Sequence, residues 1–237
     1  GGSRAGHLML LHQAIIEARN PTLVLNHDDR LLTPRGRQVF LDYLKGAGPI
    51  VAHVDRAADI RQLLAFQRQY GIPRIVITGG AEAWRVAPEL AAAKVTVIVD
   101  PLWNLPDGVD AVGATLENAA RLHAAGVTVG FSRMDPEPHN VRKLRQAAGV
   151  AAAHGLPKDV ALAAITRVPA EAFGVADRAG SLEVGRPADF VLWDGDPLEV
   201  TSWPQGVWIG GVRQPERTRQ TELRDRYLEK LRQGEAR

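Results

Sequence analysis

Four short apolar runs decide the fold class: PIVAH at residues 49–53, RIVIT at 74–78, VTVIV at 95–99 and VTVGF at 127–131. β-Branched side chains dominate the runs, and Gly, Pro or Asp bounds each of them. Nearly continuous apolar runs of this length are typical of strands that are buried on both faces of a parallel sheet. We therefore expect four strands that belong to one parallel sheet.

Helical patterns separate these runs. Residues 57–70 place apolar side chains at helical spacing, residues 115–125 behave similarly, and residues 81–93 have a helical composition that Pro88 should shorten or kink. Gly71 and Gly126 follow two of these patterns, where a left-handed cap is favoured. Outside this stretch we expect further helices at residues 8–18, 38–45, 140–153 and 158–173.

The alternation of strand and helix predicts an α/β fold built from βαβ units. Four units cannot close an eight-stranded barrel. Either the sheet is open and doubly wound, or the other four units lie elsewhere. No glycine-rich G-x-G-x-x-G loop supports the first alternative.

Composition limits the classes of function. The chain has 237 residues, 45% of them hydrophobic, a formal charge of +2 and no cysteine. A near-neutral balance argues against a dedicated nucleic-acid surface, and the lack of cysteine excludes disulfides and thiolate chemistry. No apolar run reaches the roughly 18 residues that span a membrane, so we expect no membrane partner. The opening GGSRAG lacks an initiator Met, and the compartment is left open.

The pattern changes near residue 178. ADFVLW at 188–193 and GVWIGGV at 206–212 are predicted to be strands, and residues 216–232 form a charged segment that suits a solvated helix or a helix that docks on a partner subunit. We accordingly divide the chain into a barrel portion (1–177), an accessory β segment (178–214) and a charged helix (215–237).

Active sites of β/α barrels lie at the carboxyl ends of the strands. The first run ends at His53, and alternation along a strand places Asp55 on the same side of the sheet. The second run ends at Thr78-Gly79-Gly80. After the fourth come Ser132, Asp135 and His139.

The C-terminal motifs resemble those of imidazolonepropionase-like amidohydrolases. The resemblance rests on TRVPAEAFG at 166–174, GSLEVGRPADFV at 180–191 and DPL at 196–198, and it extends to HVDRAADI at 53–60 and HNVRKLRQAAG at 139–149. It covers roughly residues 49–212. It implies the C-terminal half of a (β/α)8 TIM-like barrel, with strands of a small accessory β-sandwich.

The same resemblance implies a hydrolase that attacks amide or cyclic amide C–N bonds with water activated by a divalent metal, zinc above all. Its partners would be a small amide-type substrate and the N-terminal half of the barrel, in the same or a separate chain, with a homo-oligomer also open. His53 falls on a fifth-strand metal ligand of the family; the alternative is a hydrogen-bonded histidine. Where the family has a histidine at the end of the sixth strand and an aspartate after the eighth, this sequence has Thr78-Gly79-Gly80 and Ser132.

Weaker candidates surround His53. Asp135 lies three residues after Ser132 and is our candidate for proton transfer. Gly79 and Gly80 either cradle an anion of the substrate with their N–H groups or form a tight turn. His139 and Asn140 either contact substrate or serve the start of a helix, where Asn140 suits a cap.

Three readings of the function follow. The first is a metal-dependent hydrolase, and the second is a non-catalytic binding or scaffold subunit with a degenerate metal site. The third is a half-barrel that needs its N-terminal half or a second copy.

Overall fold

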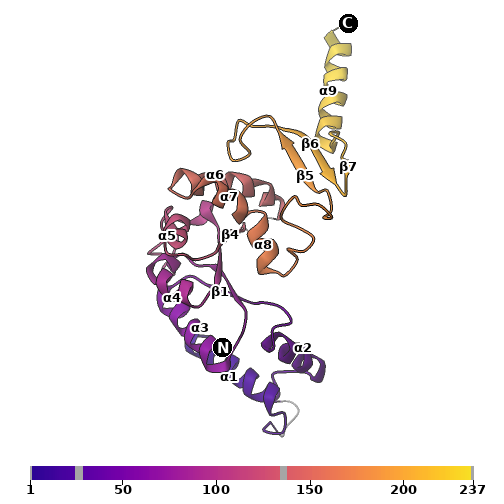
Figure 1. Cartoon of the computed structure of the whole chain (residues 1–237). Helices are drawn as coiled ribbons and strands as arrows, with labels where there is room; N and C mark the ends of the chain where they lie inside the picture. The colour runs from indigo at the N-terminus through magenta and orange to yellow at the C-terminus, as the bar shows by residue number, and fades with distance from the viewer. Residues whose placement is uncertain (1, 25–28, 134–137, 236–237) are drawn as a thin grey trace.

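The computed structural model describes residues 2–24, 29–133 and 138–235. Its centre is a four-stranded parallel sheet in the order β1-β2-β3-β4 (Figure 1). The strands are β1 (Ile50–Val54), β2 (Ile75–Gly79), β3 (Thr96–Val99) and β4 (Val129–Phe131). The predicted α/β class and the parallel sheet are therefore confirmed.

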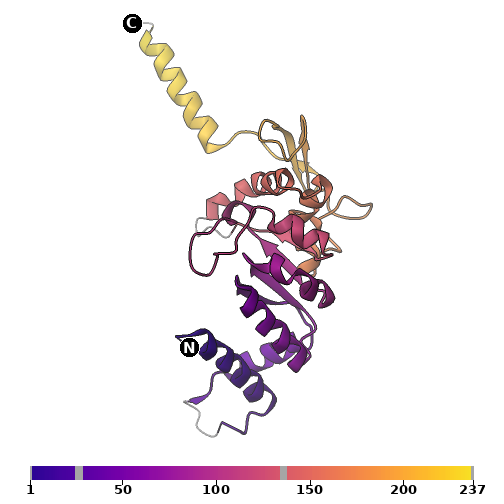
Figure 2. The same ribbon diagram turned by 90° about the vertical axis from the view of Figure 1, so that its left-hand side faces the viewer.

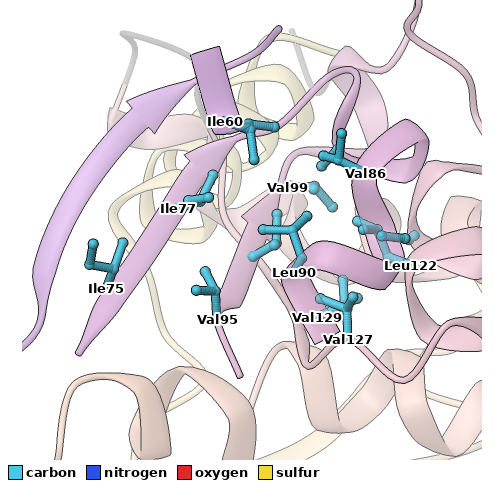
Figure 3. Packing of buried hydrophobic residues seen from close by; sticks show 14 of the residues in the cluster. Ile60, Ile75, Ile77, Val86, Leu90, Val95, Val99, Leu122, Val127 and Val129 are labelled. Carbon is cyan, nitrogen blue, oxygen red and sulfur yellow. The ribbon is translucent and has the colours of Figure 1, made fainter. Parts of the chain in front are cut away.

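Alternation along the strands gives the sheet two different faces. One face carries Ile75, Ile77, Val97, Val99 and their neighbours, which pack against helices in the main hydrophobic cluster (Figure 3). Those helices are α3 (Ala57–Tyr70), η2 (Ala83–Val86), α4 (Ala87–Ala92) and α5 (Asn118–Ala124).

The opposite face is covered in part. Val76 and Ile98 are buried there with Ala172 of α8 (Arg167–Ala172). At the edge strand β1, Val51 retains 49% of its exposure. His53 lies two residues further along the same face, paired in register with Thr78.

Helices that come before β1 and after β4 in the chain also contribute residues to the main hydrophobic cluster. Before β1 come α1 (Arg4–Arg19), which Ser3 caps, and α2 (Pro34–Leu44), which Thr33 caps. After β4 come η4 (Pro138–Lys143), α6 (Leu144–Ala153) and α7 (Lys158–Ala164). Helix α6 packs against η3 (Pro101–Trp103), the short helix that follows β3.

Two predicted helices are interrupted, and proline explains both. The helix expected over 158–173 divides into α7 and α8, because Pro169 lacks an N–H and its ring would clash with the carbonyl of Ile165. The one expected over 81–93 divides into η2 and α4, with Pro88 in the first turn of α4. Gly71 and Gly126 adopt positive φ of 66° and 84°, as the cap prediction requires.

The C-terminal region forms a second, antiparallel sheet in the order β5-β6-β7. Its strands are β5 (Phe190–Trp193), β6 (Pro204–Ile209) and β7 (Val212–Arg213). The single strand predicted over 206–212 was wrong: Gly210 and Gly211, both at positive φ, turn the chain back on itself. Helix α9 (Arg219–Glu235) follows and projects away from the rest (Figure 2).

Among the helices that the structure describes, none combines the length and the hydropathy that crossing a lipid bilayer requires.

Candidate active site

The candidate site begins at the carboxyl end of β1. His53 Nε2 lies 3.4 Å from Asp55 Oδ2, as strand alternation predicted, and His53 Nδ1 lies 3.4 Å from the hydroxyl of Thr78 on β2. The His53 side chain is 59% exposed and that of Asp55 27%. The imidazole is thus held between two polar neighbours and is still open to a ligand.

Asp55 also fixes the turn that follows β2. Its Oδ1 accepts from the N–H of Ala81 at 3.2 Å, and its backbone carbonyl accepts from the N–H of Glu82 at 2.8 Å. Glu82 in return accepts at Oε2 from the N–H of Ala57, at the start of α3. Asp55 and Glu82 therefore join the segment that follows β1 to the turn that follows β2 through three hydrogen bonds.

Gly79 leaves the space that this arrangement needs. A Cβ at Gly79 would lie 2.6 Å from Asp55 Oδ1 and 2.8 Å from His53 Cε1. Its φ of 86° is also one that residues with a Cβ rarely adopt. The side chains of His53 and Asp55 thus fill the position next to β2 where the family resemblance leads one to expect a histidine.

Gly80 is used by the fold itself. Its N–H donates to the carbonyl of Val54 at 2.8 Å, and its carbonyl accepts from the side-chain amide of Asn118 at 2.9 Å. This favours the tight-turn interpretation of the glycine pair over an anion cradle. Substrate contact at Gly79 and Gly80 stays a prediction.

A buried ion pair lies at the ends of β3 and β4. Arg133 Nη1 contacts Asp100 Oδ1, and the two side chains are 8% and 2% exposed. Asp100 also caps η3, because its Oδ1 accepts from the N–H of Leu102 at 3.0 Å. Sequence reasoning missed Arg133. An arginine two residues after a buried strand was the available signal.

The remaining predicted residues follow β4, at the edge of the sheet opposite β1. Asp135 lies outside the described residues. His139 is exposed in η4, and the adjacent Asn140 is 7% exposed. Their predicted roles in substrate binding stay predictions.

Metal binding can be tested against this geometry. Within residues 2–24, 29–133 and 138–235, no three His, Cys, Asp or Glu side chains gather closely enough to hold an ion. His53 and Asp55 are donors of the kind that zinc accepts, whereas a catalytic zinc site has three protein ligands. Asp100 is engaged by a guanidinium. Among the residues that the structure describes, the His53–Asp55 pair at the end of β1 fits a divalent ion in part.

Comparison with known proteins supports the family suggested by the motifs. A family model described as the amidohydrolase family matches residues 46–214. An N-acetylglucosamine-6-phosphate deacetylase of Caenorhabditis elegans is 32% identical over 129 residues, which is 53% of this chain and 29% of that protein. An imidazolonepropionase of Pseudomonas aeruginosa is 36% identical over 96 residues, covering 40% of this chain and 22% of that protein.

A solved structure extends the similarity to most of the chain. The amidohydrolase from Thermotoga maritima MSB8 superposes with a TM-score of 0.79 and 27% identity, covering 91% of this chain and 57% of that one. This chain thus spans little more than half of that structure and less than a third of the two curated relatives. The resemblance to imidazolonepropionase-like amidohydrolases is confirmed.

Proposed function

The chain belongs to the amidohydrolase family, and from this premise we propose that it takes part in hydrolysing a C–N bond of a small amide or cyclic amide. The relatives support this class of reaction, since they include a deacetylase and an imidazolonepropionase. In the proposal the chain supplies the second half of a (β/α)8 barrel. The first half, in the same or a separate chain, supplies the rest of the mouth.

The His53–Asp55 pair is the observation that carries the proposal. It lies at the carboxyl end of a parallel strand, where barrel enzymes place their chemistry. A neutral imidazole can bind a divalent ion, and a carboxylate beside the ring helps to orient it. The 3.4 Å separation and the exposure of the ring suit that role.

We further propose His53 as a ligand of a divalent ion, with zinc as the first candidate and Asp55 as the neighbouring donor. At least one further ligand must then come from outside the described residues, because these two side chains do not complete a site. A bound ion of this kind polarises a carbonyl and lowers the pKa of its bound water. Asp135 remains the proposed group for proton transfer.

Metal content tests the assignment of His53. The protein, a His53→Ala variant and a matched His123→Ala variant, altered on α5 away from the strand ends, are purified without chelators and measured by inductively coupled plasma mass spectrometry. We expect near-stoichiometric zinc or another divalent metal in the protein and in the control, and loss of it in His53→Ala. Metal that stays bound in His53→Ala would remove His53 from the proposal.

A second candidate is a subunit that binds a small molecule without hydrolysing it. The specific observation in its favour is that Gly79 and Ser132 stand at the two places where the resemblance leads one to expect metal ligands, and that Asp100, at the end of β3, is engaged by Arg133. Hydrolysis of a panel of amides, lactams and dipeptides decides between the candidates. Binding by calorimetry without turnover, in a metal-free sample, would favour the binding subunit.

The proposed partner half can be tested by mass. β1 pairs with β2 on one side, and in the described sheet it is an edge strand. Light scattering coupled to size exclusion distinguishes a monomer of 25.7 kDa from a homo-oligomer. Co-purification of a chain that supplies the first four β/α units would support a two-chain barrel.

A further inference from the structure

A cavity of about 760 Å³ opens beside His53 and Asp55, between α1 and the carboxyl end of β1. Leu8, Leu11 and Leu63 form an apolar part of its lining. A cavity of this size is in the range that accommodates a small organic ligand. Its contact with the His53–Asp55 pair places such a ligand next to the proposed chemistry.

Two guanidinium groups on the cavity lining converge on one carboxylate. Arg4, at the start of α1, contacts Asp110 Oδ1 through Nη2, and Arg56, just after β1, has its Nη1 3.8 Å from the same oxygen. Arg4 also pairs with Asp59 through Nε at 2.9 Å. Arg4 is therefore shared between Asp59 and Asp110. Of these two carboxylates, Arg56 pairs with Asp110.

Asp110 comes from a distant part of the chain. It lies between η3 and α5, 106 residues from Arg4. Its neighbours Val109 and Val112 are largely exposed, at 80% and 67%. The ion pairs with Arg4 and Arg56 therefore attach Asp110 over the cavity. Three residues further on, the carbonyl of Gly113 accepts a hydrogen bond from Trp84 Nε1 at 2.8 Å.

We propose that Arg4 and Arg56 bind the carboxylate of a small amide ligand, and that Asp110 occupies this position in the free protein. Guanidinium groups match planar carboxylates and hold them through paired N–H donors. The ligand class is thus an amide with a free carboxylate and an apolar side chain, which the leucine-lined wall accepts. The inference rests on the proposed function, because the cavity adjoins the His53–Asp55 pair and lies along the edge strand β1, where the first half of the barrel must leave it accessible.

A charged and a neutral probe of the same shape test the proposal. N-acetyl-L-leucine and N-acetyl-L-leucine amide are titrated by isothermal calorimetry into the full chain. The variants are Arg56→Gln, Asp110→Asn and a matched control, Asp107→Asn, whose carboxylate in the same stretch contacts the Trp103 indole. Far-ultraviolet circular dichroism and thermal unfolding establish that each variant is folded.

The protein should bind the carboxylate more tightly than the amide. Asp110→Asn removes the competing carboxylate from two exposed ion pairs, so it should tighten N-acetyl-L-leucine binding by about threefold to tenfold and leave the neutral amide unchanged. Arg56→Gln should abolish the preference for the charged probe. Asp107→Asn should behave like the unaltered protein.

Equal affinity for the two probes, or an Asp110→Asn variant indistinguishable from Asp107→Asn, would overturn the proposal. The readout is binding, so it is separate from hydrolysis. The expected binding pattern without turnover would retain the carboxylate site and reject the hydrolase. Hydrolysis of both probes at equal efficiency would retain the hydrolase and reject the carboxylate site.

Discussion

Replacing Gly79 by alanine tests the geometry of the candidate site directly. The new Cβ would lie 2.6 Å from Asp55 Oδ1 and 2.8 Å from His53 Cε1, closer than non-bonded atoms approach. Both contacts are with the ends of side chains, and His53 is largely exposed, so the two side chains can move away. We therefore expect the protein to fold with His53 and Asp55 displaced.

The cost has two parts. A residue with a Cβ in the left-handed region costs about 1–2 kcal/mol. Displacing Asp55 also breaks its hydrogen bond from the N–H of Ala81, worth about 1 kcal/mol. The free energy of unfolding of Gly79→Ala should therefore fall by about 2–3 kcal/mol.

Gly126 supplies a matched control. Its φ of 84° nearly equals the 86° of Gly79, and a Cβ there would meet nothing within 4 Å. Gly126→Ala should lose the backbone part alone, about 1–2 kcal/mol. The smaller conformational entropy of an unfolded chain that contains alanine affects both variants alike, so the difference between them isolates the contacts at Gly79.

Urea unfolding at 25 °C measures the stabilities of the two variants. Proton NMR of the His53 imidazole, assigned with His53→Ala, reports the position of the ring. The Cε1–H signal should shift in Gly79→Ala and stay in place in Gly126→Ala. Equal stabilities together with an unmoved His53 signal would refute the conclusion that His53 and Asp55 fill the space beside Gly79.

Two further predictions concern ion pairs. Arg133→Ala removes the guanidinium that contacts the buried carboxylate of Asp100, and urea unfolding should show a loss of about 3–5 kcal/mol; a loss below about 1 kcal/mol would mean that the pair is accessible to water. At the second pair, the hydrogen bond from Lys158 lowers the pKa of Asp196 below 3.8 and raises that of Lys158 above 10.5. The pair therefore stabilises the fold between these values, a contribution lost as pH falls through the lowered pKa of Asp196 or rises through the raised pKa of Lys158. The melting temperatures of the protein and of Lys158→Ala should differ within this range and converge below and above it. A constant difference at all pH values would contradict the assignment.

Much of the central sheet follows from sequence, because a buried parallel strand must be apolar on both faces. The four runs fall within two residues of the observed strand starts. The His53–Asp55 pair follows from the same local rule, since alternate residues share a face. The break in the helix expected over 158–173 could also have been predicted from the sequence, because Pro169 cannot form a helical hydrogen bond to the carbonyl of Ile165.

Only the tertiary structure decides which distant charges meet. Arg4 and Arg56 converge on Asp110, and Arg4 is 106 positions away from it in the sequence. Arg133 is buried against Asp100, which lies 33 positions earlier. The spacing of apolar residues indicates which side of a helix or strand a residue occupies. It does not indicate which loop from elsewhere in the chain packs over that side. The sequence by itself therefore determined the α/β class, the family and the His53–Asp55 pair, whereas the ionic surroundings of that pair depended on how the connections between strands fold over the sheet.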